Sequence, residues 1–284
     1  MLGQNRIMKD WLYKRLTLGY FVGPYLENAV SACHKIENLG WTSTICPWNY
    51  SGDDPRKVFE DYKSALLALQ EEQLKCYLSV KVPAMGYDYH LLRDLLKIAA
   101  QKNSRIHFDA QQPETANKSF QMIEKALSEY ANISCTLPAR WQRSKSDAER
   151  IIEWKIPVRV VKGEWADPNV PKLNPRSRFL DLIRFLSGKA AHVMVASHDA
   201  PLVKNCITEL IRSSTSCELE QLYGLPIKAV QYAQKVDIPV RFYIPYGRSC
   251  LPYSFESIKR RPIILVWVIK DLILGNRFRL PNIG

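Results

Sequence analysis

The sequence lacks the signatures of a secreted, zinc-binding or membrane-spanning protein. Its seven cysteines are odd in number and never form a Cys-x-x-Cys spacing, which argues against disulfides and a zinc site and favours a reducing compartment. The N-terminus has no apolar signal core, so we expect no export. The longest apolar stretch, Ile263–Leu274, contains Lys270 and Asp271, and it is too short and too charged to cross a bilayer. These absences predict a cytoplasmic protein, with peripheral membrane association left open.

The sequence also lacks a basic stripe, although the chain is strongly basic overall. Lys and Arg number 40 against 28 Asp and Glu, which gives a net charge of +12. Such a surplus can serve nucleic acid, an anionic membrane or an acidic partner. The basic residues are spread along the chain, and residues 259–261 form the densest cluster without interleaved aromatics. We therefore expect no nucleic-acid binding, whereas an acidic protein partner stays among the alternatives.

Short β-like runs alternate with helix-like stretches along the chain. Eight runs rich in Val, Ile, Tyr, Phe or Cys are short enough to be strands. The predicted strands are Gly40–Cys46, Cys76–Val82, Arg105–Ala110, Asn132–Leu137, Val158–Val161, His192–Ala196, Glu218–Tyr223 and Val240–Ile244. The predicted helices are Pro55–Glu71, Asp88–Gln101, Pro113–Tyr130, Ser144–Trp154, Pro175–Leu186, Pro201–Arg212, Ile227–Val236 and Ser254–Leu274.

This alternation predicts an α/β fold, a (β/α)8 barrel of the TIM type formed by residues 37–284. A helical-looking stretch, Lys9–Ile36, precedes the first strand, so residues 1–36 are expected to form an N-terminal helical segment that caps the barrel. No linker or break in the rhythm indicates a second domain. The alternative is an open doubly wound sheet, which the absence of a GxGxxG motif after the first strand disfavours.

Polar residues gather at the C-terminal ends of five of the predicted strands, where barrels of this type carry their active groups. These residues are Lys81, Asp109, Arg159 with Lys162, Ser197-His198-Asp199, and Tyr243. Arg159 lies inside an apolar run, where a charge is costly unless it is paired, and Gly163 permits close approach of a ligand to the backbone. Cations, one carboxylate and no Cys/His cluster favour an organic anion or a phosphate-bearing cofactor over a metal.

Ordinary structural roles are the alternative for each of these residues taken singly. Lys81 could extend to solvent along an apolar surface, and Asp109 could cap the following helix. His198 could be a buried imidazole with satisfied hydrogen bonds. The gathering of all of them at one end of the strands favours a site.

Six motifs occur in the order and with the spacing of a known family. The chain contains LSVKVPAMG, IHFDAQQPET, VRVVKGEWADP, HVMVASHD, CELEQLYGL and IPVRFYIPYG. The last four are similar to VRLVKGAY, VAIATHD, FEFQMLYG and VRVYVPYG of the proline dehydrogenase family, and the first two resemble its second and third strands. The resemblance extends from about Gly19 to Leu274, which is nearly the whole chain.

The resemblance implies an FAD-dependent oxidoreductase. Members of this family are (β/α)8 barrels that bind FAD non-covalently, remove hydride from the carbon beside the ring nitrogen of proline, and pass the electrons to a quinone. It therefore implies oxidation of a C–N bond of proline, to 1-pyrroline-5-carboxylate, or of a proline-like cyclic amine, with proline metabolism as the setting.

The resemblance also implies roles for individual residues. Arg159 would lie near the reactive flavin nitrogen, where a fixed positive charge stabilises the reduced ring. The residues implied to hold or line the cofactor are Lys162, Gly163, Ser197, His198 and Glu220, and those implied on the substrate side are Lys81, Asp109, Trp165 and Tyr243. Because Asp109 and Lys81 both stand at strand ends, we expect Asp109 to pair with Lys81 and to orient the substrate.

The last predicted helix departs from the family at its substrate clamp. The family's YFMRRLAERP carries two Arg that hold the proline carboxylate in a bidentate contact. Here the stretch is YSFESIKRRP, and alignment without a gap from Tyr253 places Glu256 and Ser257 at the two Arg positions. Either the clamp is replaced, or Arg260 and Arg261 form it one helical turn, about 6 Å, further along.

A second departure favours replacement. The family's first strand leads into DHLGE, whose Glu pairs with one clamp Arg, whereas this chain reads CPWNY with Tyr50 at the Glu position. Loss of both partners leaves no unpaired buried charge. Pro138 and Glu220 likewise stand at positions where the family has Gln.

A replaced clamp widens the choice of function. The substrate would then lack a free carboxylate or carry a cation at that position. A proline tethered through its carbonyl to an acidic carrier protein, in a specialised biosynthetic pathway, would also fit. An alternative of another class is a catalytically silent barrel that binds flavin or a protein partner.

Overall fold

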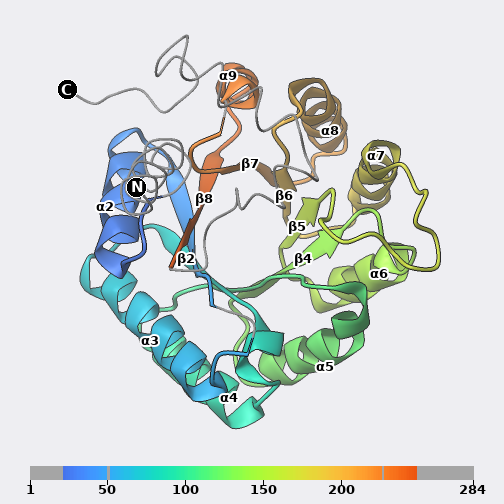
Figure 1. The fold of residues 1–284 in the computed structure, drawn as a ribbon. Coiled ribbons are helices and arrows are strands. Elements are labelled where there is room, and N and C mark those ends of the chain that lie inside the picture. Colours follow the sequence, from blue (N-terminus) through green and yellow to red (C-terminus); the bar gives the residue numbers. More distant parts are fainter. Residues whose placement is uncertain (1–21, 50–51, 226, 248–284) are drawn as a thin grey trace, which may run out of the picture.

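The computed structural model describes residues 22–49, 52–225 and 227–247 (Figure 1). Eight parallel strands follow one another in chain order and close into a barrel, because β8 pairs with β1. The strands are β1 (Thr42–Pro47), β2 (Cys76–Val80), β3 (Ile106–Phe108), β4 (Ile133–Pro138), β5 (Val158–Val161), β6 (Val193–Ala196), β7 (Cys217–Leu222) and β8 (Val240–Tyr246). The predicted barrel is therefore confirmed, and the open sheet is excluded.

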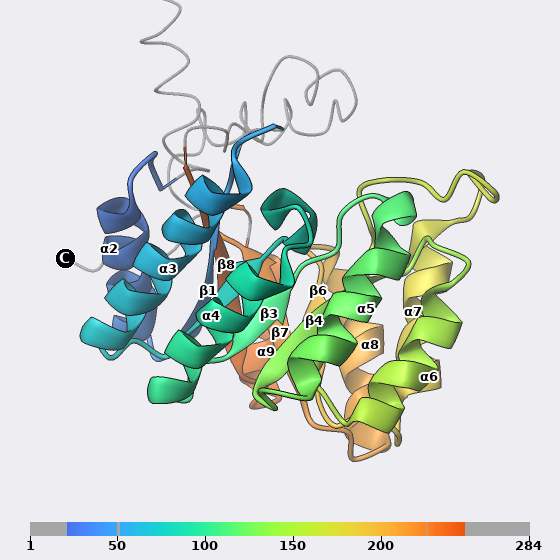
Figure 2. The ribbon, with the colours of Figure 1, turned by 90° about the horizontal axis from the view of Figure 1, so that it is seen from below.

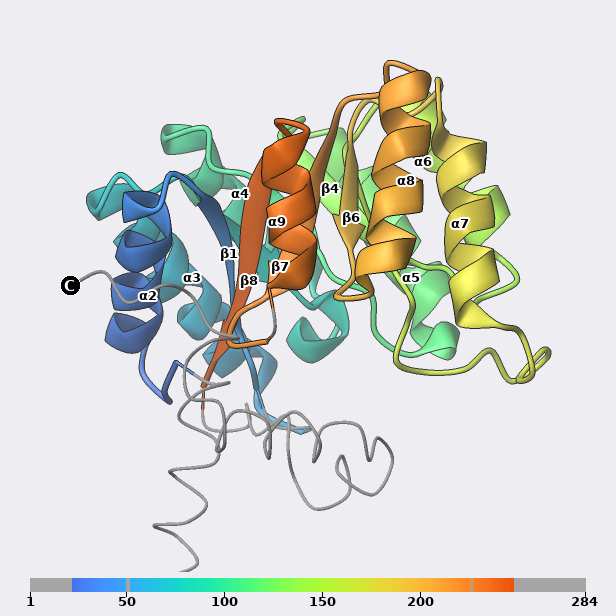
Figure 3. The ribbon, with the colours of Figure 1, turned by 90° about the horizontal axis from the view of Figure 1, so that it is seen from above.

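Helices form a ring around the strands and run alongside them (Figures 1, 2 and 3). They are α2 (Leu26–Asn38), α3 (Pro55–Glu71), α4 (Tyr89–Gln101), α5 (Ala116–Leu127), α6 (Ser144–Trp154), α7 (Pro175–Leu186), α8 (Ala200–Arg212) and α9 (Lys228–Lys235). Two short 3-10 helices, Val82–Met85 and Pro113–Thr115, precede α4 and α5. None of the helices in the described part of the chain is both long and apolar enough to cross a membrane.

The strand and helix boundaries agree with the sequence pattern to within a few residues. The expected strand at 76–82 ends earlier, at Val80, because a 3-10 helix with Pro83 in its first turn begins at Val82. Lys81 thus leaves the ladder and lies at the mouth of the barrel. The expected helical stretch Lys9–Ile36 is confirmed only in part: residues 22–25 are not helical, and α2 begins at Leu26 and packs against the outer face of β1 and β8 instead of capping an end of the barrel. Residues 9–21 and the expected helix Ser254–Leu274 lie outside the described residues. The division at residue 36 stays a prediction.

Short polar side chains start several of these helices. Asp54 accepts a hydrogen bond from the Arg56 amide at 2.8 Å, and Pro55 occupies the first turn of α3. Asn174 caps α7 in the same way, again with a Pro directly after it. Such caps satisfy backbone N–H groups that have no partner inside the helix, and Pro costs nothing there because no hydrogen bond is lost. Local sequence signals therefore set where these capped helices begin, and with them the loops that precede the helices.

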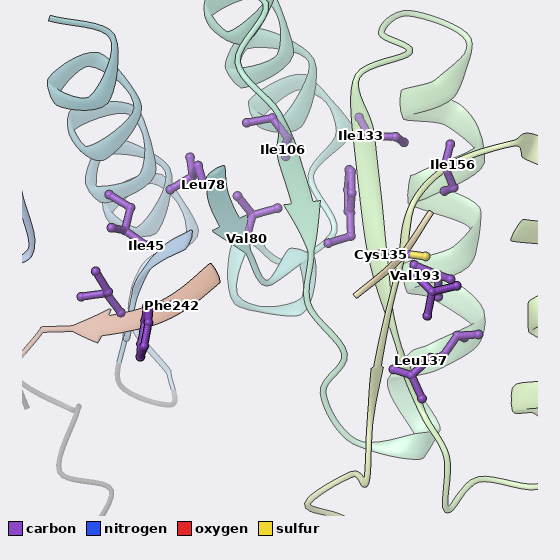
Figure 4. Close-up of a cluster of buried hydrophobic side chains, with 14 of the residues drawn as sticks. Ile45, Leu78, Val80, Ile106, Ile133, Cys135, Leu137, Ile156, Val193 and Phe242 are labelled. Atoms are coloured by element: carbon purple, nitrogen blue, oxygen red, sulfur yellow. The ribbon is translucent and has the colours of Figure 1, made fainter. Parts of the chain in front are cut away.

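The main hydrophobic core lies between the barrel and its helices. Alternate strand residues point outward, and Figure 4 shows several of them, among them Ile106 on β3 and Leu137 on β4. Helix α2 covers the outer face of β1 and β8, with its buried face formed by Ala29, Ala32, Cys33 and Ile36. Each helix supplies an apolar stripe of this kind, so the barrel is covered without a large apolar lining on its inside.

The barrel interior is polar. Glu218 on β7 and Arg241 on β8 form a buried ion pair, with Nε 2.8 Å from Oε1. Arg241 also donates to the Ser43 carbonyl at 2.6 Å and stacks on the Tyr77 ring at 3.5 Å. Burial opposes ionisation of Glu218, yet Arg241, together with His192 at 3.8 Å, outweighs it and lowers the pKa of this carboxyl to about 2. This pair therefore contributes stability that depends on pH.

The ionised Glu218 stabilises the fold at neutral pH, and this contribution is lost as the pH falls from about 4.5 toward about 2, because the folded-state pKa is the lower one. At about 1.4 kcal/mol per pKa unit, the contribution is about 3 kcal/mol. We expect Glu218→Gln to unfold more easily than the parent at pH 7 and to lose less stability in acid. Urea unfolding at pH 7 and pH 3 measures both free energies; a gap of equal size at the two pH values would contradict this assignment.

Candidate active site

A cleft of about 730 Å³ opens at the C-terminal ends of the strands. Except for Asp199, which caps α8, all the predicted site residues that the structure describes line this cleft, and they number ten. They are Lys81, Asp109, Arg159, Lys162, Gly163, Trp165, Ser197, His198, Glu220 and Tyr243. The remaining predicted residues, Tyr253, Glu256, Ser257, Arg260 and Arg261, lie outside the described residues, as does Tyr50.

Asp109 is the residue where the contacts of the cleft floor converge. It directly follows β3, and its Oδ2 accepts a hydrogen bond from the Tyr243 hydroxyl at 3.0 Å. Its Oδ1 accepts from the Thr136 hydroxyl at 3.1 Å and lies 3.7 Å from Nη1 of Arg159. Burial, reinforced by Asp109, raises the pKa of Tyr243 well above its usual value, so this phenol stays protonated and donates. Asp109 is thus held by three strands and is not a helix cap.

His107 supports this carboxylate from inside the barrel. Its Nε2 lies 2.7 Å from the Thr136 hydroxyl and its Nδ1 lies 2.8 Å from the Ser134 hydroxyl. Because Thr136 gives its only proton to Asp109, it must accept from Nε2, and Nδ1 then accepts from Ser134. Burial, together with Arg159, lowers the pKa of His107 well below its usual value, which keeps the ring neutral. A fixed chain of donors therefore ends on Asp109.

Lys81 lines the cleft and lies against an aromatic side chain. Its ammonium stands 4.5 Å from the centre of the Trp48 ring, a cation–π distance, and Trp48 Nε1 donates to the Tyr243 hydroxyl at 3.4 Å. The backbone N–H of Lys81 donates to the hydroxyl of the buried Tyr62 at 3.0 Å, which joins α3 to the end of β2. The sequence predicted that Asp109 would pair with Lys81, but no ion pair joins these two described residues, because Asp109 is engaged by Tyr243, Thr136 and Arg159.

Arg159 enters the cleft from the middle of β5, and it is paired as its apolar surroundings require. Its Nε donates to Oε2 of Glu220 at 2.7 Å, and its Nη2 lies 2.7 Å from Oε1. Burial acts to lower the pKa of Arg159, but the carboxylates of Glu220 and Asp109 raise it, so the guanidinium stays charged. The guanidinium also lies 5.0 Å from the centre of the Tyr243 ring. Four strands thus contribute to one polar cluster.

The flank of the cleft beside β5 and β6 is basic. Lys162 lies 3.1 Å from Oδ2 of Asp199, and Arg176 lies 3.4 Å from the same oxygen. Partial burial opposes ionisation of Asp199, but the Leu202 amide and Lys162 outweigh it and lower the pKa of this carboxyl. Asp199 therefore caps α8 and holds Lys162 at the rim. His198 Nε2 accepts from the Leu222 amide at 2.9 Å, which fixes its other ring nitrogen as protonated in the neutral ring.

The backbone conformation and packing at position 163 require a glycine, independently of any ligand. Its φ of +90° is one that side-chain-bearing residues rarely adopt, and a Cβ here would lie 3.0 Å from both Pro138 and Arg140. The close approach that Gly163 permits is therefore to the neighbouring β4 loop. Arg140 Nη1 donates to the Glu164 carbonyl at 3.1 Å, so this loop and the loop after β5 are tied together.

Several cleft residues escaped the sequence analysis. Trp48, Thr136, Arg140 and Gln221 line the cleft, and His107 supports it from below. Thr136 and His107 were detectable in principle, because alternation places them on the inward face of strands that end at the site. Trp48 and Arg140 lie in loops, where no periodicity indicates the direction of a side chain. Only the structure shows that these residues belong to the site.

Comparison with known proteins places the chain in a family. The family model for proline dehydrogenase matches residues 49–253. Among curated proteins, proline dehydrogenase 1 of Bacillus subtilis is 24% identical over 276 residues and covers 89% of this chain and 89% of its own length. The proline dehydrogenase of Deinococcus radiodurans is 22% identical over 278 residues, with 90% and 89% covered.

Solved structures show the same fold. Proline utilization A from Bdellovibrio bacteriovorus superposes with a TM-score of 0.74 at 14% identity, covering 93% of this chain and 33% of that one. The protein of the same name from Corynebacterium freiburgense gives a TM-score of 0.70 at 16% identity, covering 96% and 33%. This chain spans about a third of those longer proteins, and at these identities the likeness concerns the fold. The match of the family model over most of the chain, on a closed barrel with its polar cleft, makes this protein a member of the proline dehydrogenase family, an oxidoreductase of the proline dehydrogenase type.

Proposed function

We propose that the chain oxidises a C–N bond of proline, or of a proline-like cyclic amine, with FAD as the cofactor. With proline itself, the product is 1-pyrroline-5-carboxylate, and a quinone takes the electrons onward. The observation that carries this proposal is the convergence of Lys81, Asp109, Arg159 and Tyr243 in one cleft. These four side chains come from four different strands or strand ends, which is the arrangement expected of a barrel active site.

The cleft fits a flavin dinucleotide. Its volume lies within the range of about 300–1,000 Å³ typical of ligand pockets. Lys162 and Arg140 supply positive charge at one flank, suited to a diphosphate. In the wall, Oε1 of Gln221 is buried and has no hydrogen-bond partner in the part of the chain that the structure describes, so it offers an acceptor to an N–H of the bound ring. Bound FAD would supply the hydride-accepting chemistry that side chains lack.

The chain's own residues orient the substrate and tune the site. Asp109 offers a carboxylate whose position is fixed by Thr136 and Tyr243, and Lys81 offers an ammonium held beneath Trp48. These opposite charges suit a zwitterion such as proline, whose own charged groups they complement. Trp48 covers part of the floor and reduces its contact with water, which strengthens the electrostatic interactions beneath it. The catalytically silent barrel is disfavoured by this intact cluster.

The substrate end of the site carries the second part of the proposal. The residues that would replace the family's clamp, Glu256 and Ser257, lie outside the described residues, so the proposal rests on their sequence. A tethered or carboxylate-free proline suits this replacement, and an acidic carrier protein suits the net charge of +12. A specialised biosynthetic role follows if such a substrate is used.

Asp109→Ala should lower turnover on the order of a hundredfold, because loss of the fixed carboxylate misplaces the substrate and releases Tyr243. Steady-state rates and circular dichroism would be measured together. Asp88→Ala is the matched control, since Asp88 caps α4 and lies outside the cleft. If both variants turn over like the parent, Asp109 has no role in the reaction.

Arg159→Ala should weaken FAD binding roughly 10- to 100-fold and lower its midpoint potential. One charged hydrogen bond is worth about 1.5–3 kcal/mol, and each 1.4 kcal/mol is about tenfold. Removal of the guanidinium also leaves negative charge at the floor, which disfavours an anionic reduced ring. Arg159→Lys keeps the charge and should recover part of both values. Fluorescence titration with FAD and redox titration supply them, and parent-like results for Arg159→Ala would remove Arg159 from the cofactor site.

Restoring the clamp should improve use of free proline. Glu256→Arg with Ser257→Arg, plus Tyr50→Glu as the lid partner, should raise kcat/KM for free proline on the order of a hundredfold, because a bidentate Arg–carboxylate contact is worth a few kcal/mol. The same change should impair a substrate without a free carboxylate, such as proline amide.

The opposite result has a clear signature. If the parent oxidises free proline efficiently and Arg260→Ala or Arg261→Ala abolishes this activity, these two Arg form the clamp one turn further along. The chain would then be a proline dehydrogenase with a shifted last helix.

A further inference from the structure

The floor of the cleft carries balanced charge. Four charged side chains meet there, two cations and two carboxylates: Lys81, Asp109, Arg159 and Glu220. Their formal charges sum to zero. This balance depends on Glu220, a residue that stands where the resembling family has an uncharged Gln. With Gln at this position, the same floor would carry one net positive charge.

Glu220 makes the two shortest contacts of the Arg159 guanidinium with a carboxylate. Both oxygens of Glu220 face the guanidinium at 2.7 Å, and the two side chains are only 2% and 3% exposed. On the other side, Nη1 of Arg159 lies 3.7 Å from Asp109. One of these contacts, from Nε to Oε2, is a hydrogen bond, and the other, between Nη2 and Oε1, is an ion-pair contact without hydrogen-bond geometry. Together the two contacts hold the guanidinium against Glu220 as well as balancing its charge.

A second buried ion pair in the same barrel serves as a comparison for an effect on the cleft, because it has no contact with the cleft. Glu218 precedes Glu220 by two residues on β7 and pairs with Arg241 at 2.8 Å, with similarly buried side chains. Alternation places both carboxylates on the inward face of β7. Glu220 lines the cleft, however, whereas Glu218 does not. The two pairs match in chemistry and burial and differ in their access to a bound molecule.

We propose that Glu220 is a positioning residue that also sets the charge of the cleft floor. It fixes the Arg159 guanidinium and cancels the positive charge that Arg159 would otherwise present to a bound anion, or to a cofactor whose reduced form is anionic. The identity of that cofactor rests on the proposed function, whereas the charge balance does not.

The first test is the midpoint potential of FAD bound to the full-length protein. Glu220→Gln should raise the equilibrium ratio of reduced to oxidised cofactor at least tenfold, which is about 30 mV for a two-electron couple. Glu218→Gln, the matched control, should stay within that margin of the parent. Glu220→Asp keeps the charge and should also stay within it, and any loss of FAD affinity in this variant reports on positioning alone.

The second test needs no cofactor and therefore separates this inference from the proposed function. Benzoate, a small organic anion, would be titrated into the full-length protein without FAD and followed by tryptophan fluorescence or calorimetry. Glu220→Gln should bind benzoate at least tenfold more tightly than the parent and Glu218→Gln. If the protein takes up no FAD, the proposed function fails, and this measurement alone decides the role of Glu220.

The outcomes are distinct. A parent-like potential in Glu220→Gln, or benzoate affinities that are equal in all three proteins or unmeasurable in all, overturns the charge-setting role. If Glu220→Gln does not fold, a double variant takes its place in the test. Arg159→Met combined with Glu220→Met removes two equal and opposite charges. The potential of that double variant should stay within tenfold of the parent ratio, and a fall beyond it would show that Arg159 acts as an uncancelled cation.

Discussion

The buried pair of Arg159 and Glu220 is the interaction on which the site depends. A guanidinium on a central barrel strand loses its hydration, and only a matching carboxylate makes such burial tolerable. Glu220 supplies that carboxylate from β7, two strands away around the barrel. Asp109 approaches the same guanidinium from β3, and the Tyr243 ring lies beside it. The C-terminal end of the barrel strands is thus organised around one charge that must be paired.

The fold accommodates these buried charges because its apolar core lies elsewhere. The apolar core lies between the strands and the helices, so the barrel interior is free to hold ion pairs and hydrogen-bonded hydroxyls (Figure 4). Closure of the sheet brings β3, β5, β7 and β8 around one axis, although Asp109 and Tyr243 are 134 positions apart in sequence. We propose that the oxidation of proline, the reaction of the family, takes place at this end of the barrel.

The sequence predicted the barrel and the residues of the floor well, for physical reasons. Strand periodicity and helix caps such as Asp54 are local signals, and the C-terminal ends of parallel strands must meet at one end of a barrel. Pairing is not a local signal, so the sequence assigned Asp109 to Lys81, whereas the structure pairs it with Tyr243, Thr136 and Arg159. The resemblance implied Glu220 as a cofactor residue, and its ion pair with Arg159 emerged only from three-dimensional proximity. The position of Trp48 in the cleft could not be predicted, because no sequence periodicity indicates the direction of a loop side chain.

The most direct test of this account is anaerobic reduction of the FAD-loaded, full-length protein by a defined amine. The visible absorbance of the flavin would be followed after mixing with proline, proline amide, hydroxyproline or pyrrolidine. The account predicts bleaching by at least one of these cyclic amines, with one equivalent of substrate consumed per flavin and faster reduction by proline amide than by free proline. A flavin that none of them bleaches, or a protein that stays colourless with added FAD, would contradict it.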